Sequence, residues 1–130
     1  MAALREWLPD LSGHLHDDVP QQTMHAMLSA NRAYFHPYRW TSLGLSLIEA
    51  MTIGMPVLAF PTTAAPESVP AAAGVLSSDP DVLVAAARRW FAEPAEAYEL
   101  GSAGRRHALE HFGLQRFLTD WQHLLKEVAG

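Results

Sequence analysis

The sequence of 130 residues contains no cysteine. This absence excludes both a disulfide framework and a metal site built from thiolates. Basic residues are scarce as well: nine lysines and arginines stand against fourteen aspartates and glutamates, giving a formal net charge of -5. A nucleic-acid-binding protein needs a basic face to offset the charge of the phosphates, so this balance argues against such a partner.

Long apolar runs are also missing. The N-terminus has no basic stretch followed by a long apolar one, and the longest apolar runs are far shorter than a membrane span. We therefore expect no transmembrane segment and a cytoplasmic location. Hydrophobic residues make up 49% of the chain and charged residues 18%, a composition that can form a packed core and argues against disorder.

Short apolar runs alternate with segments of helical periodicity from residue 19 onward. This alternation predicts an α/β domain, a Rossmann-like parallel sheet covered by helices, over residues 19–130. Residues 1–18 form a poorly defined N-terminal segment. The expected strands are 33–36, 57–60 and 74–77, and the expected helices begin near residues 20, 44, 80, 94 and 114, with a loop or one helical turn within 61–73.

The most informative segment runs from residue 36 to residue 60. A turn-rich loop leads to Gly44, Leu47 and Met51 follow at helical spacing, and Gly54 ends the helix before the next strand. The start of a helix leaves backbone N–H groups unpaired and carries the positive end of the helix dipole, so such a loop can hold a phosphate. In open parallel sheets ligands bind at the carboxyl ends of the strands, where this loop is expected.

The string of residues 42–51, Ser-Leu-Gly-Leu-Ser-Leu-Ile-Glu-Ala-Met, followed by Gly-Met-Pro-Val at 54–57, resembles the donor-binding segment of retaining GT-B glycosyltransferases of the group 1 family. Pro66 and Glu67 also match the Pro-Glu pair that follows the next strand in that family. The resemblance runs from about Val19 to the C-terminus. It implies that the chain is part of a GT-B C-terminal domain, which binds a nucleotide-diphosphate sugar and needs no cofactor.

The resemblance also implies roles for single residues. Glu49 matches the glutamate that binds the ribose, and the amides of Gly44 and Leu45 match those that face the diphosphate and the sugar. Ser42 and Leu43 stand where the family has a glycine and an aromatic residue. Thr41 stands where the family has a glutamate against the donor sugar, and a threonine can bond a hydroxyl but carries no charge.

A chain of this length corresponds to one domain, whereas a GT-B enzyme closes two domains around its substrates. We therefore expect the chain alone to be a catalytically incomplete part of a glycosyltransferase that transfers a glycosyl group, with retention, to an unknown acceptor. An acceptor-binding domain or a second chain would complete it.

The alternative to a ligand site is that both residues are purely structural: Gly44 is a turn residue and Glu49 is a surface carboxylate. Thr41 and Ser42 have a comparable alternative as helix caps. Four residues beside the loop can reach a sugar or a base, although Trp40 is more often a packing residue in such a place: His36, Tyr38, Arg39 and Trp40.

A different chemistry is offered by His107-Ala-Leu-Glu110-His111, because histidines four apart on a helix can share a zinc ion while the glutamate acts on bound water. Such a zinc hydrolase would need a third ligand, for which the last helix offers Asp120, His123 and Glu127. Leu109 and Phe112 are expected on the buried side of the histidine helix.

A third hypothesis is a non-catalytic module that pairs with another polypeptide. The last helix carries two aromatic residues and several leucines on one face. Its amphipathic spacing favours a helix that covers the sheet, and a docking surface for a partner is the alternative.

Overall fold

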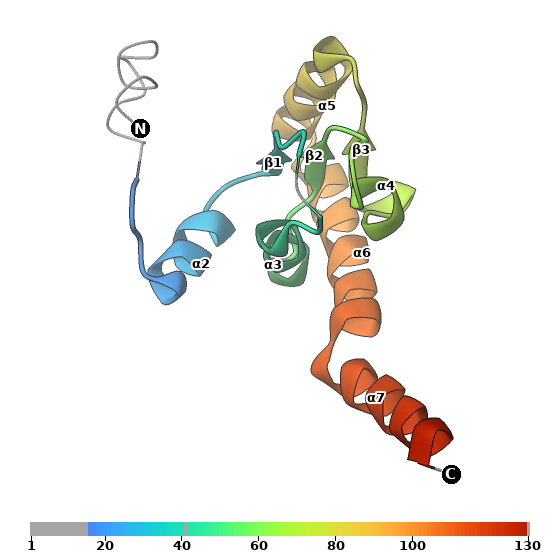
Figure 1. Ribbon diagram of the computed structural model, residues 1–130. Coiled ribbons are helices and arrows are strands. Elements are labelled where there is room, and N and C mark those ends of the chain that lie inside the picture. Colours follow the sequence, from blue (N-terminus) through green and yellow to red (C-terminus); the bar gives the residue numbers. More distant parts are fainter. Residues whose placement is uncertain (1–15, 41, 130) are drawn as a thin grey trace.

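The computed structural model describes residues 16–40 and 42–129. Strands and helical segments alternate over residues 21–92, and two further helices follow (Figure 1). In chain order they are α2 (Gln21–Ser29), β1 (Tyr34–His36), α3 (Leu45–Ile53), β2 (Val57–Ala59), α4 (Ala65–Ser68), the 3-10 helix η2 (Ala71–Ala73), β3 (Gly74–Leu76), α5 (Pro80–Ala92), α6 (Pro94–Phe112) and α7 (Leu114–Ala129). The predicted α/β class is confirmed, and the boundaries agree with the predicted ones to within about one residue.

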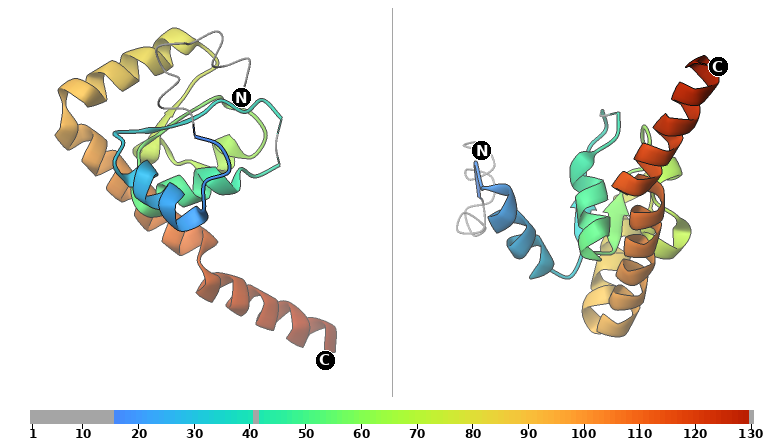
Figure 2. Two further views of the ribbon diagram at one scale, coloured as in Figure 1. Left: turned by 90° about the vertical axis from the view of Figure 1, so that its left-hand side faces the viewer. Right: turned by 90° about the horizontal axis from the view of Figure 1, so that it is seen from below.

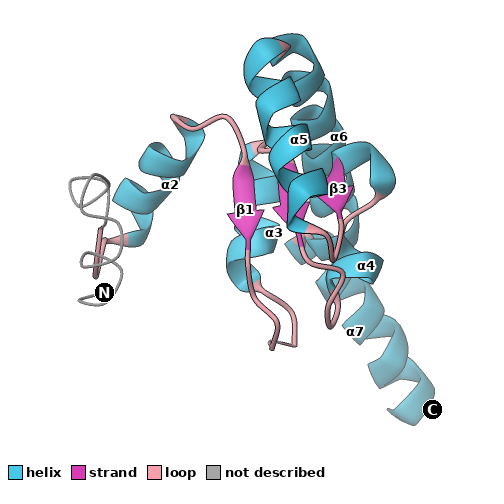
Figure 3. Cartoon of the chain, turned by 90° about the horizontal axis from the view of Figure 1, so that it is seen from above, coloured by secondary structure: helices cyan, strands magenta, loops and turns pink. Residues whose placement is uncertain are grey.

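The described strands form one parallel sheet in the order β1-β2-β3. Phe35 pairs with Leu58 and Leu58 with Val75, while the residues on either side of each point to the opposite face of the sheet. Both faces are covered by helices, as the cartoon seen from above shows (Figure 3). Burial on both sides is complete at β2, which explains why that strand reads as an apolar run, whereas Phe35 of the edge strand β1 is 50% exposed.

On one face, α3, α4 and the C-terminal half of α6 enclose the first core cluster. Its buried members are Leu47, Met51, Val57, Ala59, Ala65, Val69, Ala73 and Ala108. On the other face α5 and the start of α6 enclose a second cluster, formed by Leu58, Leu83, Ala86, Trp90 and Ala97. The predicted buried stripe of α5 is confirmed at Leu83, Ala86 and Trp90, and Ala87 is half-buried.

Local signals in the sequence account for the helix ends. Gly54 adopts a φ of 96°, which an L side chain disfavours, and its N–H closes the last turn of α3. Asp79 caps α5 by accepting a hydrogen bond from the Asp81 amide at 2.9 Å, and Pro80 follows as the first helical residue.

Helix α7 departs from the prediction. It extends away from the sheet in both views of Figure 2, and none of its residues is buried. The interpretation that the last helix covers the sheet is therefore wrong, because the sheet faces are already occupied by α3, α4, α5 and α6. None of the described helices is long and apolar enough to cross a membrane.

Candidate functional site

The loop that follows β1, described at residues 37–40 and 42–44, lies at the carboxyl edge of the sheet, between the end of β1 and the start of α3 (Figure 3). Gly44 is the N-cap of α3, and no side chain of the described residues caps this helix. The cap interpretation is therefore wrong for Ser42. The first N–H groups of α3 lack partners within the helix and can be offered to a ligand.

Gly44 is required by the residue beneath it. A Cβ atom added at Gly44 would lie 2.5 Å from Cε1 of His36, much closer than carbon atoms approach one another. The His36 side chain is buried under the loop, with only 3% of its surface exposed. We assign His36 to support of the loop, since its ring is covered by protein and lies against Gly44.

A short polar network extends from His36 to the first turn of α3. The Tyr34 hydroxyl donates to Ser46 Oγ at 2.8 Å, and His36 Nδ1 lies 3.3 Å from the same hydroxyl. Burial lowers the pKa of His36, so its imidazole is neutral at pH 7, and burial raises the pKa of Tyr34 despite the hydrogen bond to Ser46. The network thus ties β1 to α3 with uncharged groups.

Glu49 lies on α3 one turn beyond the loop, about 6 Å along the helix axis from Leu45. Its Oε1 accepts a hydrogen bond from Gln21 Nε2 of α2 at 2.8 Å. His25 Nε2, one turn further along α2, lies 3.7 Å from the same oxygen. Sequence reasoning missed both α2 residues, because nothing in the local pattern signals contacts made across 28 and 24 positions of the chain.

A cleft of about 640 Å³ opens beside the loop at the same edge of the sheet. It is lined by Arg39, Trp40, Phe60, Pro61, Thr62, Thr63, Ser78 and Pro80. The Arg39 guanidinium lies over the Phe60 ring at 5.8 Å, and Thr62 Oγ1 donates to the Tyr38 carbonyl at 2.8 Å, which joins the loops that follow β1 and β2. Trp40 is 91% exposed, so its interpretation as a packing residue is wrong.

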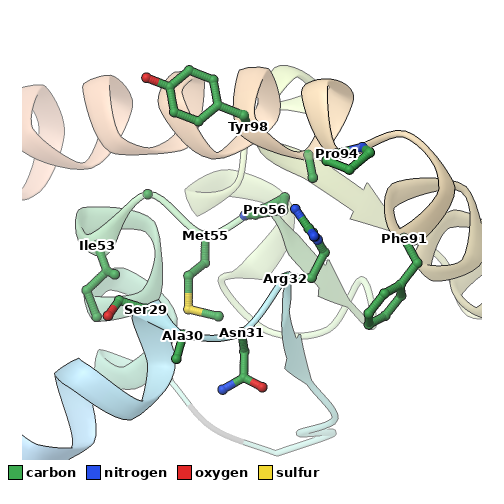
Figure 4. Close-up of a pocket in the computed structure, with 12 residues that line it drawn as sticks. Ser29, Ala30, Asn31, Arg32, Ile53, Met55, Pro56, Phe91, Pro94 and Tyr98 are labelled. Carbon is green, nitrogen blue, oxygen red and sulfur yellow. The ribbon is translucent and has the colours of Figure 1, made fainter.

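A second cleft, of about 430 Å³, opens at the opposite edge of the sheet (Figure 4). Arg32 and Pro56, which precede β1 and β2, line it together with Tyr98 of α6. The C-terminal ends of α2 and α3 lie here, and their carbonyl groups disfavour an anion, whereas Arg32 and the first turn of α6 in the same lining favour one.

The predicted site residues differ in their exposure to solvent. Ser42 is exposed, Leu43 and Gly44 are half-buried, and Leu45 is 75% exposed in the first turn of α3. Glu49 lies on the same helix, with 29% of its side chain exposed. Thr41 lies outside the described residues.

The histidine motif has two members in contact. The His107 and His111 rings stack with centroids 4.0 Å apart on α6, and burial lowers the pKa of His107. Among the described residues no group of three potential ligands gathers around a metal position. The buried side of α6 is made of small residues, so the expectation that Leu109 and Phe112 are buried is wrong: they are 52% and 38% exposed.

Comparison with solved structures supports the α/β fold. Among solved structures, the chain is similar to sucrose-phosphate synthase from Thermosynechococcus elongatus, with a TM-score of 0.82 and 25% sequence identity. The match covers 98% of this chain and 33% of the synthase chain, so the chain spans a third of that structure. No curated protein sequence matches.

The sequence model of the family described as glycosyl transferases group 1 matches residues 14–107. This range includes the loop, α3 and both strands beside them, so it contains all the predicted donor-binding residues. The Rossmann-like fold and the resemblance to part of a GT-B glycosyltransferase are confirmed, and the chain belongs to the glycosyl transferases group 1 family.

Proposed function

We propose that this chain binds the nucleotide-diphosphate sugar donor of a retaining glycosyltransferase. The observation that carries the proposal is the placement of the family motif: Gly44 begins α3 at the carboxyl edge of the sheet, and Glu49 follows on the same helix. The diphosphate would be held by the first amides of α3, and the ribose by the Glu49 carboxylate.

This arrangement suits the chemistry of glycosyl transfer. When the glycosyl bond breaks, negative charge develops on the diphosphate that leaves. The amides of Gly44 and Leu45 and the positive end of the α3 dipole are fixed before the reaction and would stabilise that charge. Stabilising the leaving diphosphate in this way needs no metal cation. We propose a cytoplasmic enzyme without a cofactor.

The acceptor side is not supplied by the described residues. A glycosyltransferase must hold the acceptor in line and exclude water, which closure of a second domain achieves. The cleft beside Arg39 and Trp40 is lined by the exposed Trp40 ring, which would offer an aromatic face to a sugar. We propose that an acceptor-binding domain or a second chain completes the active site.

Calorimetric titration of the purified chain with UDP, GDP and ADP tests the donor site. We expect saturable binding of at least one of them, and at least about tenfold weaker binding by Glu49→Ala, because hydrogen bonds to a charged group contribute about 1.5–3 kcal/mol. Glu99→Ala is the matched control, since Glu99 is an exposed glutamate on α6, far along the chain from the loop. A folded chain that binds none of the three nucleotides contradicts the proposal.

A non-catalytic module that pairs with another polypeptide is the second candidate, and the exposure of α7 favours it. Seven large apolar residues of this helix are each at least 44% exposed: Leu114, Phe117, Leu118, Trp121, Leu124, Leu125 and Val128. Contiguous exposed apolar patches can mark interaction surfaces. A chain ending at Gly113 should keep its cooperative unfolding transition, and loss of that transition would show that α7 is needed for folding instead.

A further inference from the structure

Helix α2 contacts the rest of the domain at α3. It packs against α3 and buries none of its own residues. The side chains of Ser29 and Asn31, at its end, bond only to carbonyls of α2 itself. Within the described part of the chain, the hydrogen bond from Gln21 to Glu49 is the one side-chain hydrogen bond that links α2 to another element.

Two residues of α2 converge on one oxygen atom of Glu49. Gln21 and His25 are four positions apart, so they share a face of the helix. Gln21 Nε2 donates to Glu49 Oε1 at 2.8 Å, and His25 Nε2 lies 3.7 Å from that same oxygen. The His25 nitrogen is buried and has no hydrogen-bond partner among the described residues. The other oxygen, Oε2, has no partner within the described part of the chain.

We propose that Gln21 and His25 are positioning residues for Glu49, an inference that rests on the proposed nucleotide site. A glutamate on a helix surface has several rotamers of similar energy, and ordering it costs free energy when a ligand binds. The Gln21 amide holds Oε1 before binding, so Oε2 is directed to accept a hydrogen bond from a ribose hydroxyl. His25 limits the movement of the carboxylate on the side of the next α2 turn.

The role proposed for Gln21 affects the specificity of the site for the ribose. Gln21 acts through the carboxylate, so its loss should weaken only the part of the affinity that depends on a ribose hydroxyl. It should therefore reduce the discrimination between a nucleoside diphosphate and the 2′-deoxy or 3′-deoxy form of the same nucleotide. A residue that only stabilised α2 would lower the affinity for all of these nucleotides alike.

The test uses the full chain and whichever of UDP, GDP and ADP binds most tightly, with its 2′-deoxy and 3′-deoxy forms. Gln21→Met removes the donor at nearly constant size, and Gln21→Lys retains a donor toward Glu49. Gln22→Met is the matched control, because Gln22 is the neighbouring exposed glutamine of α2 and makes no side-chain hydrogen bond among the described residues. Dissociation constants come from calorimetry.

For Gln21→Met we expect about three- to tenfold weaker binding of the ribonucleotide and little change for at least one deoxy form. Gln21→Lys should restore most of the loss, and Gln22→Met should match the unaltered chain. In a Glu49→Ala background Gln21→Met should have no further effect, as expected for two residues that act as a unit. His25→Phe should change binding in the same direction as Gln21→Met and by less.

Unchanged discrimination in Gln21→Met overturns the inference, and the donor site stands if Glu49→Ala still weakens binding. An equal loss in Gln22→Met also overturns it, since the effect then belongs to α2 as a whole. Failure of the unaltered chain to bind any of the three nucleotides removes the proposed function itself, and the inference with it.

Discussion

Helices α6 and α7 follow one another along the chain and use apolar residues in opposite ways. Helix α6 buries a stripe of small residues, Ala97, Gly101, Gly104 and Ala108, against the sheet and α3. Helix α7 carries a stripe of leucines and aromatic residues, and none of them is buried. The better amphipathic pattern thus belongs to the helix that packs on less of the domain.

Close approach of the backbones, rather than side-chain size, places a helix in this core. At Gly101 a Cβ atom would overlap with the Gly54 carbonyl at the end of α3, so α6 and α3 touch backbone to backbone. The Arg105 guanidinium adds a hydrogen bond to the Thr52 carbonyl across the same contact. Helix α7 offers a wide apolar face instead, which suits a partner outside the described domain.

The largest expected effect separates two tryptophans. Trp90 is fully buried, and Trp121 of α7 is 48% exposed. Trp90→Ala should lower the free energy of unfolding by about 3–5 kcal/mol, because it leaves a cavity in the second core cluster. Trp121→Ala should cost less than about 1 kcal/mol. Urea denaturation of both variants measures this, and equal losses would mean that α7 is part of the folding unit.

A smaller effect is expected within α6. Gly101→Ala should lower the free energy of unfolding by about 1–3 kcal/mol, since the methyl group must push α6 away from backbone atoms. At Gly104 the nearest atom to an added Cβ is the Ala73 side chain at 3.2 Å, and the gain in helix propensity of about 1 kcal/mol opposes the crowding. Gly104→Ala should therefore be nearly neutral, and a larger loss there than at Gly101 would contradict this packing.

The smallest effect concerns pH. Burial holds the pKa values of His36 and His107 below the usual value of 6.5, while both titrate normally in the unfolded chain. The unfolded state thus binds more protons, so stability is complete above about pH 6.5 and falls as the pH drops through that value toward the lowered ones. His36→Gln should flatten the decline in denaturation midpoint between about pH 7.5 and about pH 5.5. An unchanged slope would mean that the pKa of His36 is not lowered in the folded chain.

Much of the fold could be predicted from the sequence, because its boundaries rest on local chemistry. Gly54, Asp79 and Pro80 fix helix ends through φ and capping, and apolar runs at the correct spacing mark the strands. The position of α7 could not be predicted, since an amphipathic pattern says that a face needs a partner but not which one. The burial of α6 was misjudged for a related reason: small residues give a weak apolar signal, and their value lies in the close approach of α3.

The site was predictable in part. The glycine loop and Glu49 are recognisable from the family motif, which is contiguous in sequence. The support of the loop by His36 and the contacts of Glu49 with Gln21 and His25 join separate elements, and only the folded chain brings them together. A contiguous sequence motif can thus indicate candidate ligand-binding residues more readily than the residues that hold them in place.

The most direct test of the donor site is a map of backbone amide shifts by NMR during titration with UDP, GDP and ADP. If the nucleotide binds at the carboxyl edge, the largest shifts fall on the amides of Gly44, Leu45 and Ser46, with smaller ones near Glu49. Largest shifts at Asn31, Arg32 and Tyr98 would place the nucleotide in the cleft at the opposite edge of the sheet and contradict the account.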